Sequence, residues 1–319
     1  MPKRRFLGCS FPLLIGLVVV VLALTVISIL SGALGEALVG DMGLPDWITV
    51  DRPHVQLPAD GIFHISGFTV TNTLLASWVS IIVLVALAWA VTRRIKLIPS
   101  RLQSLLEFAI EWMLNLCVDV AGEKNGRRFF PVITTIFLFV LFNAWLGLIP
   151  GFGSILIGGT EGHQVHLLRG ANTDINMPLA LAIVSFIFVE YFGLRSGGGL
   201  RYLKKFINVG QFFRGAGQLV RGKVRAGVVG VGMGAIDIFV GLLEGLSEMV
   251  RIVSFTFRLF GNMTGGEILI LMMFFLAPWV LAIPFYGLEL LVGLVQAIVF
   301  AGLTLVFATI AVTPHEEAH

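Results

Sequence analysis

Several ionisable side chains lie inside a long apolar part of this sequence. Arg258 belongs to the long apolar stretch 226–313, with Glu244 before it and Glu267 and Glu289 after it. A charged side chain at the centre of a membrane costs at least about 2.5 kcal/mol, so it must contact protein or water there. The guanidinium keeps its proton at every working pH, whereas a carboxylate takes up and releases one. This combination is suited to moving protons past a fixed positive charge.

The spacing of these residues separates them onto two helix faces. Asn262 follows Arg258 by four residues, which at about 100° per residue keeps it near the arginine's face. Glu267 follows by nine residues and therefore points about 180° away. Glu289 and Gln296 are seven residues apart and share a face of the next helix. We expect Glu267 to meet Glu289 and Gln296, apart from the arginine.

A plainer interpretation is that these groups only form salt bridges within a helical bundle. Glu244, Arg251 and Arg258 follow one another at seven-residue steps, so they share a face, and Glu244 is then a partner for Arg251. The gathering of so many charged and amide side chains in one pair of helices favours a proton path over purely structural pairing.

The composition identifies the setting of these residues. Of the 319 residues, 57% are hydrophobic and 13% are charged, about half of the roughly 25% charged residues of a soluble domain. Apolar stretches of about twenty residues suit spanning helices, whereas a membrane barrel alternates apolar and polar residues. The sequence therefore excludes a cytosolic enzyme or a nucleic-acid-binding domain. It predicts an all-α integral membrane protein with about five or six membrane helices.

The positive charges predict the topology. Lys and Arg cluster as three at 3–5, four at 93–101, three at 124–128 and eight at 195–225. The positive-inside rule places these clusters in the cytoplasm, with 36–72 and 151–176 outside. The basic cytoplasmic loop 195–225 is expected to contact lipid headgroups or other proteins. The C-terminus is then cytoplasmic, and a multi-pass protein of a cell membrane, most simply a bacterial one, is expected.

Three parts of the chain follow from this layout. Residues 1–35 hold a membrane helix that is either retained or a cleaved signal peptide ending near Ser31-Gly32-Ala33; its apolar core is longer than the usual 7–15 residues of a signal peptide. Residues 36–72 form an extracytoplasmic segment, and 73–319 form the membrane domain. Within that domain, 98–122 mixes polar and apolar residues at helical spacing and is expected to be an interfacial helix.

Four short stretches closely resemble subunit a of F-type ATP synthases. The main one runs Ser254-Phe-Thr-Phe-Arg258-Leu-Phe-Gly-Asn262-Met-Thr-Gly-Gly-Glu267. The others are Asn143-Ala-Trp-Leu-Gly-Leu-Ile-Pro150, Thr173-Asp174-Ile-Asn176 and Glu244-Gly-Leu-Ser, and Gln296 also matches. The resemblance extends over roughly 60–313 and leaves the N-terminal segment uncovered.

This resemblance implies a stator proton channel beside a rotating ring of c subunits, with the last two helices, after residue 226, long and strongly tilted as a hairpin against that ring. Arg258 would face the ring, and the outer aqueous half-channel would be lined by Asn262, Glu267, Glu289 and Gln296, with Asp174 as a further candidate. Glu244 would lie toward the inner half-channel. The resemblance implies no catalytic centre and no cofactor in this chain. It implies as partners the c ring, b-type stator subunits, the soluble catalytic head and membrane lipid, and no nucleic acid.

One departure from the family pattern and several alternatives remain. Many relatives carry histidine at the position of Glu289, so a pair of glutamates is expected to alter the pH dependence of the path. A stand-alone ion channel or antiporter would also use buried Arg and Glu, but an internal repeat typical of many transporters is not evident. His315-Glu-Glu-Ala-His319 resembles a zinc-protease motif and is expected to be a solvated tail. Gly230 and Gly234 are expected to be helix contacts. His163 and His166 in the outer segment are candidates for proton entry but are expected to be exposed loop histidines.

Overall fold

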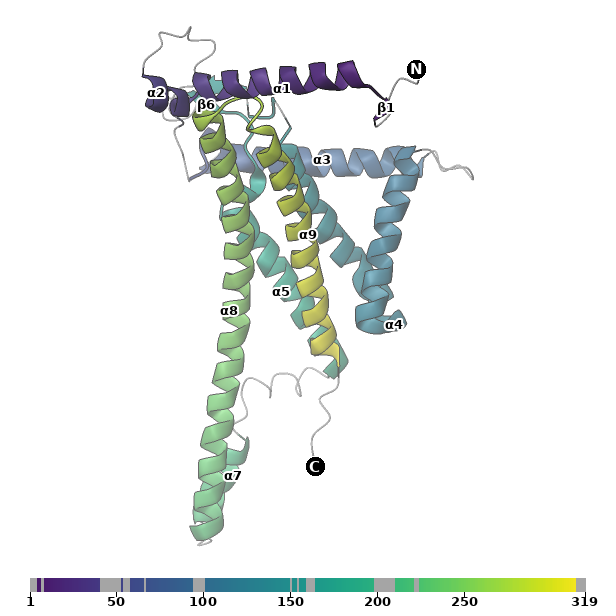
Figure 1. Cartoon of the computed structure of the whole chain (residues 1–319). Helices are drawn as coiled ribbons and strands as arrows, with labels where there is room; N and C mark the ends of the chain where they lie inside the picture. Colours follow the sequence, from purple (N-terminus) through teal and green to yellow (C-terminus); the bar gives the residue numbers. More distant parts are fainter. Residues whose placement is uncertain are drawn as a thin grey trace. The chain divides into compact units, whose positions relative to one another are not determined.

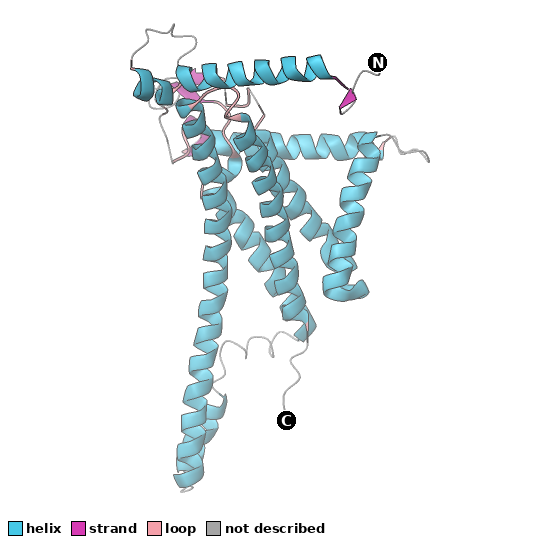
Figure 2. Cartoon of the chain, in the orientation of Figure 1, coloured by secondary structure: helices cyan, strands magenta, loops and turns pink. Residues whose placement is uncertain are grey.

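Helices dominate this chain in the computed structural model (Figure 2). The structure describes residues 5–6, 9–40, 53, 58–65, 67–93, 101–149, 151–153, 155–158, 164–197, 210–220 and 224–313. The α-helices, labelled in Figure 1, are α1 (Phe11–Ser31), α2 (Ala33–Val39), α3 (Asn72–Thr92), α4 (Arg101–Gly147), α5 (Asn176–Gly197), α7 (Gly210–Val220), α8 (Val224–Leu276) and α9 (Ile283–Val312), and the short 3-10 helix η1 (Ala171–Thr173) precedes α5.

The strands are confined to three small antiparallel hairpins. These pair β1 (Arg5–Phe6) with β2 (Cys9–Ser10), β3 (Gly61–Ile65) with β4 (Phe68–Thr71), and β5 (Leu156–Gly158) with β6 (Gln164–His166). They lie in the segments that connect or precede the helices.

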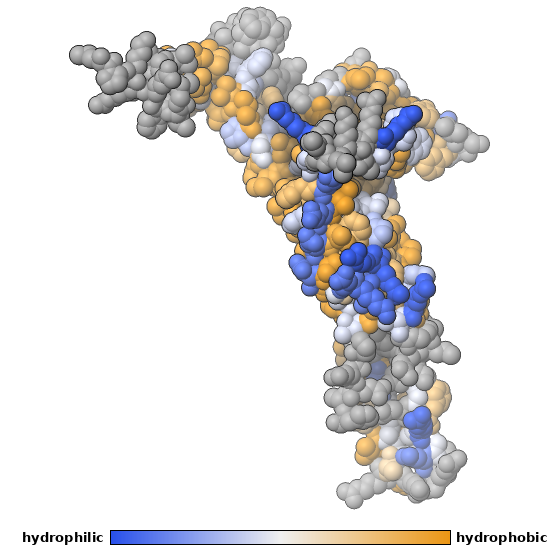
Figure 3. All heavy atoms as spheres, turned by 90° about the vertical axis from the view of Figure 1, so that its right-hand side faces the viewer, coloured by the Kyte–Doolittle hydropathy of each residue, from blue (hydrophilic) through white to orange (hydrophobic). Residues whose placement is uncertain are grey.

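The number of membrane-spanning helices agrees with the sequence. Among the described residues, α3, α4, α5, α8 and α9 are long and apolar enough to cross a membrane, and α1 with α2 forms a sixth candidate bent by 78°. Apolar atoms cover much of the helical surface in Figure 3, as expected for helices that face lipid. The prediction of an all-α membrane protein with five or six helices is confirmed.

Two helices depart from the predicted segments in length. Helix α4 joins the expected interfacial stretch 98–122 to the apolar stretch that follows, and Gly122 with φ +75° marks a break between the two parts. That left-handed backbone conformation suits glycine, which has no Cβ. Helix α8 has 53 residues, a length of about 80 Å, against about 30 Å of membrane hydrocarbon. The expectation that α8 and α9 are long is confirmed; their tilt stays a prediction.

The chain divides into two compact units. The first consists of Met1–Ala76, Asn143–Asp174 and Gly261–Val295, and the second of Ser77–Phe142, Ile175–Phe260 and Gln296–His319. Several helices, α8 and α9 among them, continue from one unit into the other.

The second unit is held together by aromatic and small residues. The Phe129 ring meets those of Phe188 and Phe192 edge to face, with centroids 5.7 and 4.9 Å apart, and Phe255 packs against Phe300 at 5.1 Å. Hydroxyls of Ser185 and Thr304 share a hydrogen bond of 2.8 Å between α5 and α9. Such pairs bind helices where lipid gives no hydrophobic drive for association.

Glycines bring α7 close to the start of α8. A methyl group at Gly230 would overlap the backbone of Gly215 in α7, and one at Gly234 would overlap Phe212. Helix backbones approach this closely only where side chains are absent. The prediction that Gly230 and Gly234 are helix contacts is confirmed.

In the first unit, the end of α1 packs on the turn between α8 and α9. Gly32 lies against the backbone of Leu276 and Ala277, where a methyl group would overlap the chain. The Ser28 hydroxyl donates to the carbonyl of Pro278, and Ser28 is fully buried. Most other described α1 side chains are apolar and exposed, as Leu17 is at 62%.

Candidate functional site

Arg258 lies in the middle of α8 with its side chain exposed. Its guanidinium carbon is 5.9 Å from the centre of the Phe255 ring, a weak cation–π contact within one helix. Among the residues that the structure describes, no carboxylate pairs with Arg258. An exposed arginine inside an apolar spanning helix is therefore left without a counter-ion from the described part of its own chain.

The neighbouring Arg251 has a different environment. Its Nη1 is 2.6 Å from Oε2 of Glu248, and its guanidinium stacks over the Phe307 ring of α9 at 3.8 Å. Arg251 thus pairs with Glu248, whereas the plainer interpretation had named Glu244 as its partner. Both carboxylate oxygens of Glu248 and the face of the Phe307 ring contact the Arg251 guanidinium. These contacts indicate that Arg251 has a structural role.

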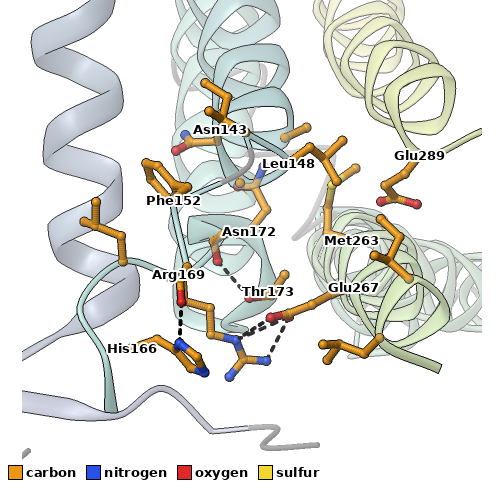
Figure 4. A pocket seen from close by; sticks show the side chains of 18 of the residues that line it. Asn143, Leu148, Phe152, His166, Arg169, Asn172, Thr173, Met263, Glu267 and Glu289 are labelled. Atoms are coloured by element: carbon orange, nitrogen blue, oxygen red, sulfur yellow. Dashed lines mark hydrogen bonds and ion pairs between the residues drawn. The ribbon is translucent and has the colours of Figure 1, made fainter. Parts of the chain in front are cut away.

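A cavity of about 680 Å³ lies entirely within the first unit. Its wall is formed by the end of α4, the chain from β6 to η1, the last part of α8 and the first part of α9 (Figure 4). The polar side chains that line it are those of Asp60, Asn143, His166, Arg169, Asn172, Thr173, Glu267, Tyr286 and Glu289. A cavity with this lining has the polar groups needed to hold water and pass protons.

Glu267 forms an ion pair with Arg169 inside the cavity. Nη2 of Arg169 is 2.9 Å from Oε2 of Glu267, and Nε donates to Oε1 at 3.0 Å. The remaining Nη1 of Arg169 donates to the carbonyl of Pro58 at 3.2 Å. Figure 4 shows the Glu267 side chain extended toward Arg169. This two-point contact is the geometry in which guanidinium and carboxylate bind most strongly.

Glu289 occupies a different position in the same cavity. Its carboxylate packs against Gly266, where even a methyl group would overlap both of its oxygens. The residue is only 6% exposed, and no cation among the described residues pairs with it. The two glutamates thus line one cavity in different surroundings. Glu267 is bound by Arg169, and Glu289 packs against the backbone of Gly266.

Replacing Gly266 by alanine should displace the Glu289 carboxylate. Forcing an extra methyl group into a packed site typically costs about 1–3 kcal/mol. For the proton channel that the resemblance to subunit a implies, we therefore expect a several-fold fall in ATP-driven proton pumping by the assembled complex in membrane vesicles. Gly287→Ala in α9 is the control, because nothing lies within 4 Å of a methyl group there and Gly287 points about 160° away from Glu289 around the helix. Equal pumping by the two variants would show that the Gly266 contact is unimportant.

The other residues expected at the site lie outside this lining. Asn262 is exposed on α8 and Asp174 accepts a hydrogen bond of 3.0 Å from the Thr73 hydroxyl, both in the first unit. Glu244 and the buried Gln296 belong to the second unit. The cavity therefore brings together only Glu267 and Glu289 of the predicted set.

The sequence alone missed the role of Arg169. The only indication in the sequence is that Arg169 is the single Lys or Arg in the outer segment 151–176. His166, expected to be an exposed loop histidine, is exposed and lines the cavity, with Nδ1 2.5 Å from the carbonyl of Gly153. His163 and the motif His315–His319 lie outside the described residues. Among the described residues, no group of three His, Cys, Asp or Glu side chains forms a metal site.

A family profile and individual relatives both match this chain over most of its length. The family profile described as ATP synthase A chain matches residues 74–309. ATP synthase subunit a of Trichlorobacter lovleyi is 31% identical over 261 residues, which cover 81% of this chain and 93% of that protein. The subunit a of Gloeobacter violaceus is 31% identical, covering 78% and 86%, and that of Aliarcobacter butzleri is 27% identical, covering 77% and 91%.

The match begins at α3 and ends three residues before α9 does, so it includes the Arg258 helix and every α4, α8 and α9 residue that lines the cavity. Helices α1 and α2 precede it. With the profile covering well over half of its residues, the chain belongs to the ATP synthase A chain family, the membrane subunit a of ATP synthases.

Proposed function

We propose that this chain is the stator proton channel of the ATP synthase membrane sector, with Arg258 facing the rotating c ring. The observation that carries the proposal is the exposed Arg258 on an apolar helix, without a counter-ion among the described residues. Such a charge costs at least about 2.5 kcal/mol facing lipid. A carboxylate on a neighbouring subunit removes that cost, and a ring of such carboxylates supplies one at every rotational step.

The fixed charge then controls the protonation of the ring. An opposite charge within about 4–6 Å favours the ionised form of a carboxylate, so a ring carboxylate releases its proton as it approaches Arg258. Because the guanidinium does not give up its own proton, it also blocks direct passage between the two sides. One proton crossing 100 mV releases about 2.3 kcal/mol, which drives rotation and ATP synthesis in the soluble head.

The cavity supports an outer aqueous path to the ring. Glu267 and Glu289 line it, with Asn262, Gln296 and Asp174 as further members of the path. Glu244 lies toward the inner path. The subunit has no catalytic centre of its own and works with the c ring, b-type stator subunits and the head, as a multi-pass protein of the cell membrane with its C-terminus in the cytoplasm.

Cysteine cross-linking tests the contact of α8 with the ring. Ser247 and Ser254 are exposed and lie within about 40° of Arg258 around the helix. Met249 is 67% exposed and points about 180° away. In a background with Cys9→Ser and Cys117→Ala, Ser254→Cys should form a disulfide with a cysteine beside the membrane carboxylate of the c subunit. Ser247→Cys should do so with a c-subunit cysteine about 16 Å further along the ring helix, the distance that separates Ser247 from Arg258.

Met249→Cys is the control and should give little cross-linking with the same c-subunit partners. The yield is measured by non-reducing gel electrophoresis of oxidised membranes. Preferential cross-linking at Met249 would put the opposite face of α8 against the ring and contradict the proposed role of Arg258.

A further inference from the structure

The two glutamates of the cavity differ in what surrounds them. Arg169 is 11% exposed in its side chain and donates three hydrogen bonds of 2.9–3.3 Å to the Glu267 carboxylate. Its fourth contact, to the carbonyl of Pro58, fixes the far side of the guanidinium. The arginine is therefore committed to this one carboxylate.

Glu289 has a different set of neighbours. It is buried beside the backbone of Gly266 with no cation paired to it in the described part of the chain. The other ionisable side chains that line the cavity are Asp60 before β3, His166 in β6 and Tyr286 in α9. Of these three, only the His166 side chain can become a cation, and within the described part of the chain it forms no ion pair with either glutamate.

We propose that Arg169 is a positioning residue that holds Glu267 as a permanent ion pair, so that Glu289 is the glutamate that carries protons through the cavity. This inference rests on the proposed function of the cavity as the outer proton path. The sequence assigned both glutamates to the outer half-channel without distinguishing them, and this inference gives Glu267 a structural role and Glu289 the role of proton carrier.

The physical reason lies in what a proton carrier must do. A carrier alternates between a charged and a neutral state, and a carboxylate bound by three guanidinium hydrogen bonds loses charge-assisted contacts each time it is protonated. Arginine cannot relieve this by losing its own proton. A carboxylate without a fixed cation, such as Glu289, has no such contacts to lose. The ion pair of Glu267 and Arg169 instead has no net charge and forms a fixed part of the cavity lining.

The proposal predicts a specific pattern in a double-mutant cycle. Arg169→Gln should lower ATP-driven proton pumping at least about tenfold, because it leaves the Glu267 charge unpaired in a mostly buried site. Arg169→Gln combined with Glu267→Gln removes both charges and should pump at least about threefold faster than Arg169→Gln alone. Arg169→Lys keeps the positive charge and should retain most of the activity.

The pH dependence of pumping gives a readout that a purely structural ion pair would not change. In Arg169→Gln the freed Glu267 becomes a second proton acceptor in the cavity, so the pH profile should differ from that of the unmodified complex. In the double variant the profile should coincide with the unmodified one. All variants are measured in the complete complex in inverted membrane vesicles, with subunit content checked on gels.

The possible results separate this proposal from the one on which it rests. An inactive double variant that is fully assembled would make Glu267 a proton carrier and overturn the role given to Arg169. A pH profile that is unchanged in Arg169→Gln would also overturn it. Normal pumping by Glu289→Gln together with Glu267→Gln would instead remove the cavity from the proton path, and the proposed function would fail with it.

Discussion

Arg258→Ala is expected to abolish ATP-driven proton pumping while the complex remains assembled. The side chain is exposed on α8 and has no carboxylate partner among the described residues, so its removal should leave the packing of the subunit intact. Without the cation, a ring carboxylate has no opposite charge to favour its ionised form, and the barrier between the two aqueous paths is lost. Pumping is measured by quenching of a pH-sensitive dye in inverted vesicles.

Two controls separate a channel defect from a folding defect. Arg251→Ala alters a nearby arginine that is already paired with Glu248, and it should act through stability, seen as loss of the subunit from the membrane. Arg258→Lys keeps a positive charge but replaces the planar guanidinium with a group whose pKa is movable, so it should recover pumping only in part. Normal pumping by assembled Arg258→Ala complexes would make the arginine structural and refute the proposed mechanism.

Glu289→Gln is expected to reduce pumping by at least about tenfold, which corresponds to about 1.4 kcal/mol in the limiting step. Glutamine has nearly the same shape as glutamate, so the contact with Gly266 is kept, but its amide cannot take up and release a proton. The loss therefore reports proton transfer rather than packing. The measurement is the initial rate of ATP-driven pumping, with ATP hydrolysis followed in parallel.

Glu123→Gln is the matched control for this substitution. Glu123 has a side chain that is 73% exposed and forms a surface pair with Arg127, a kind of pair that contributes about 0–1 kcal/mol. It should pump normally. Glu289→Asp keeps a carboxyl group one methylene shorter and should keep part of the rate. Full pumping by Glu289→Gln would show that protons reach the ring by a route that avoids this residue.

The sequence predicted the spanning helices well because their signal is local. Stretches of about twenty apolar residues can only be helices in lipid, where every backbone group needs a partner within its own segment. The hairpin of β3 and β4 was not predicted, since 36–72 carried only the expectation of an extracytoplasmic segment. Its Phe63 and Phe68 are exposed, so the short strands lack the buried alternation by which a strand is recognised.

The candidate site was predicted in part, and the limit has a physical cause. Helical periodicity put Glu267 on the side of α8 away from Arg258, because the angle between two residues of one helix follows from their spacing, and it predicted that Glu267 meets Glu289 and Gln296. The cavity contains both glutamates but not Gln296. The partner of Glu267 is Arg169, which is 98 residues away in the chain. Only the folded arrangement of a loop against α8 brings those two together, and no periodicity within one element contains that information.

The contact between α1 and the turn after α8 has a consequence for how the protein is made. Ser28 and Pro278 are separated by 250 residues, which a ribosome adds in roughly 10–50 s at about 5–20 residues per second. During that interval α1 is already synthesised, and the backbone that Gly32 packs against does not yet exist. The docking of α1 is thus among the last steps of biogenesis. A peptidase that cut after Ala33 within this interval would leave the finished turn without the helix that covers it.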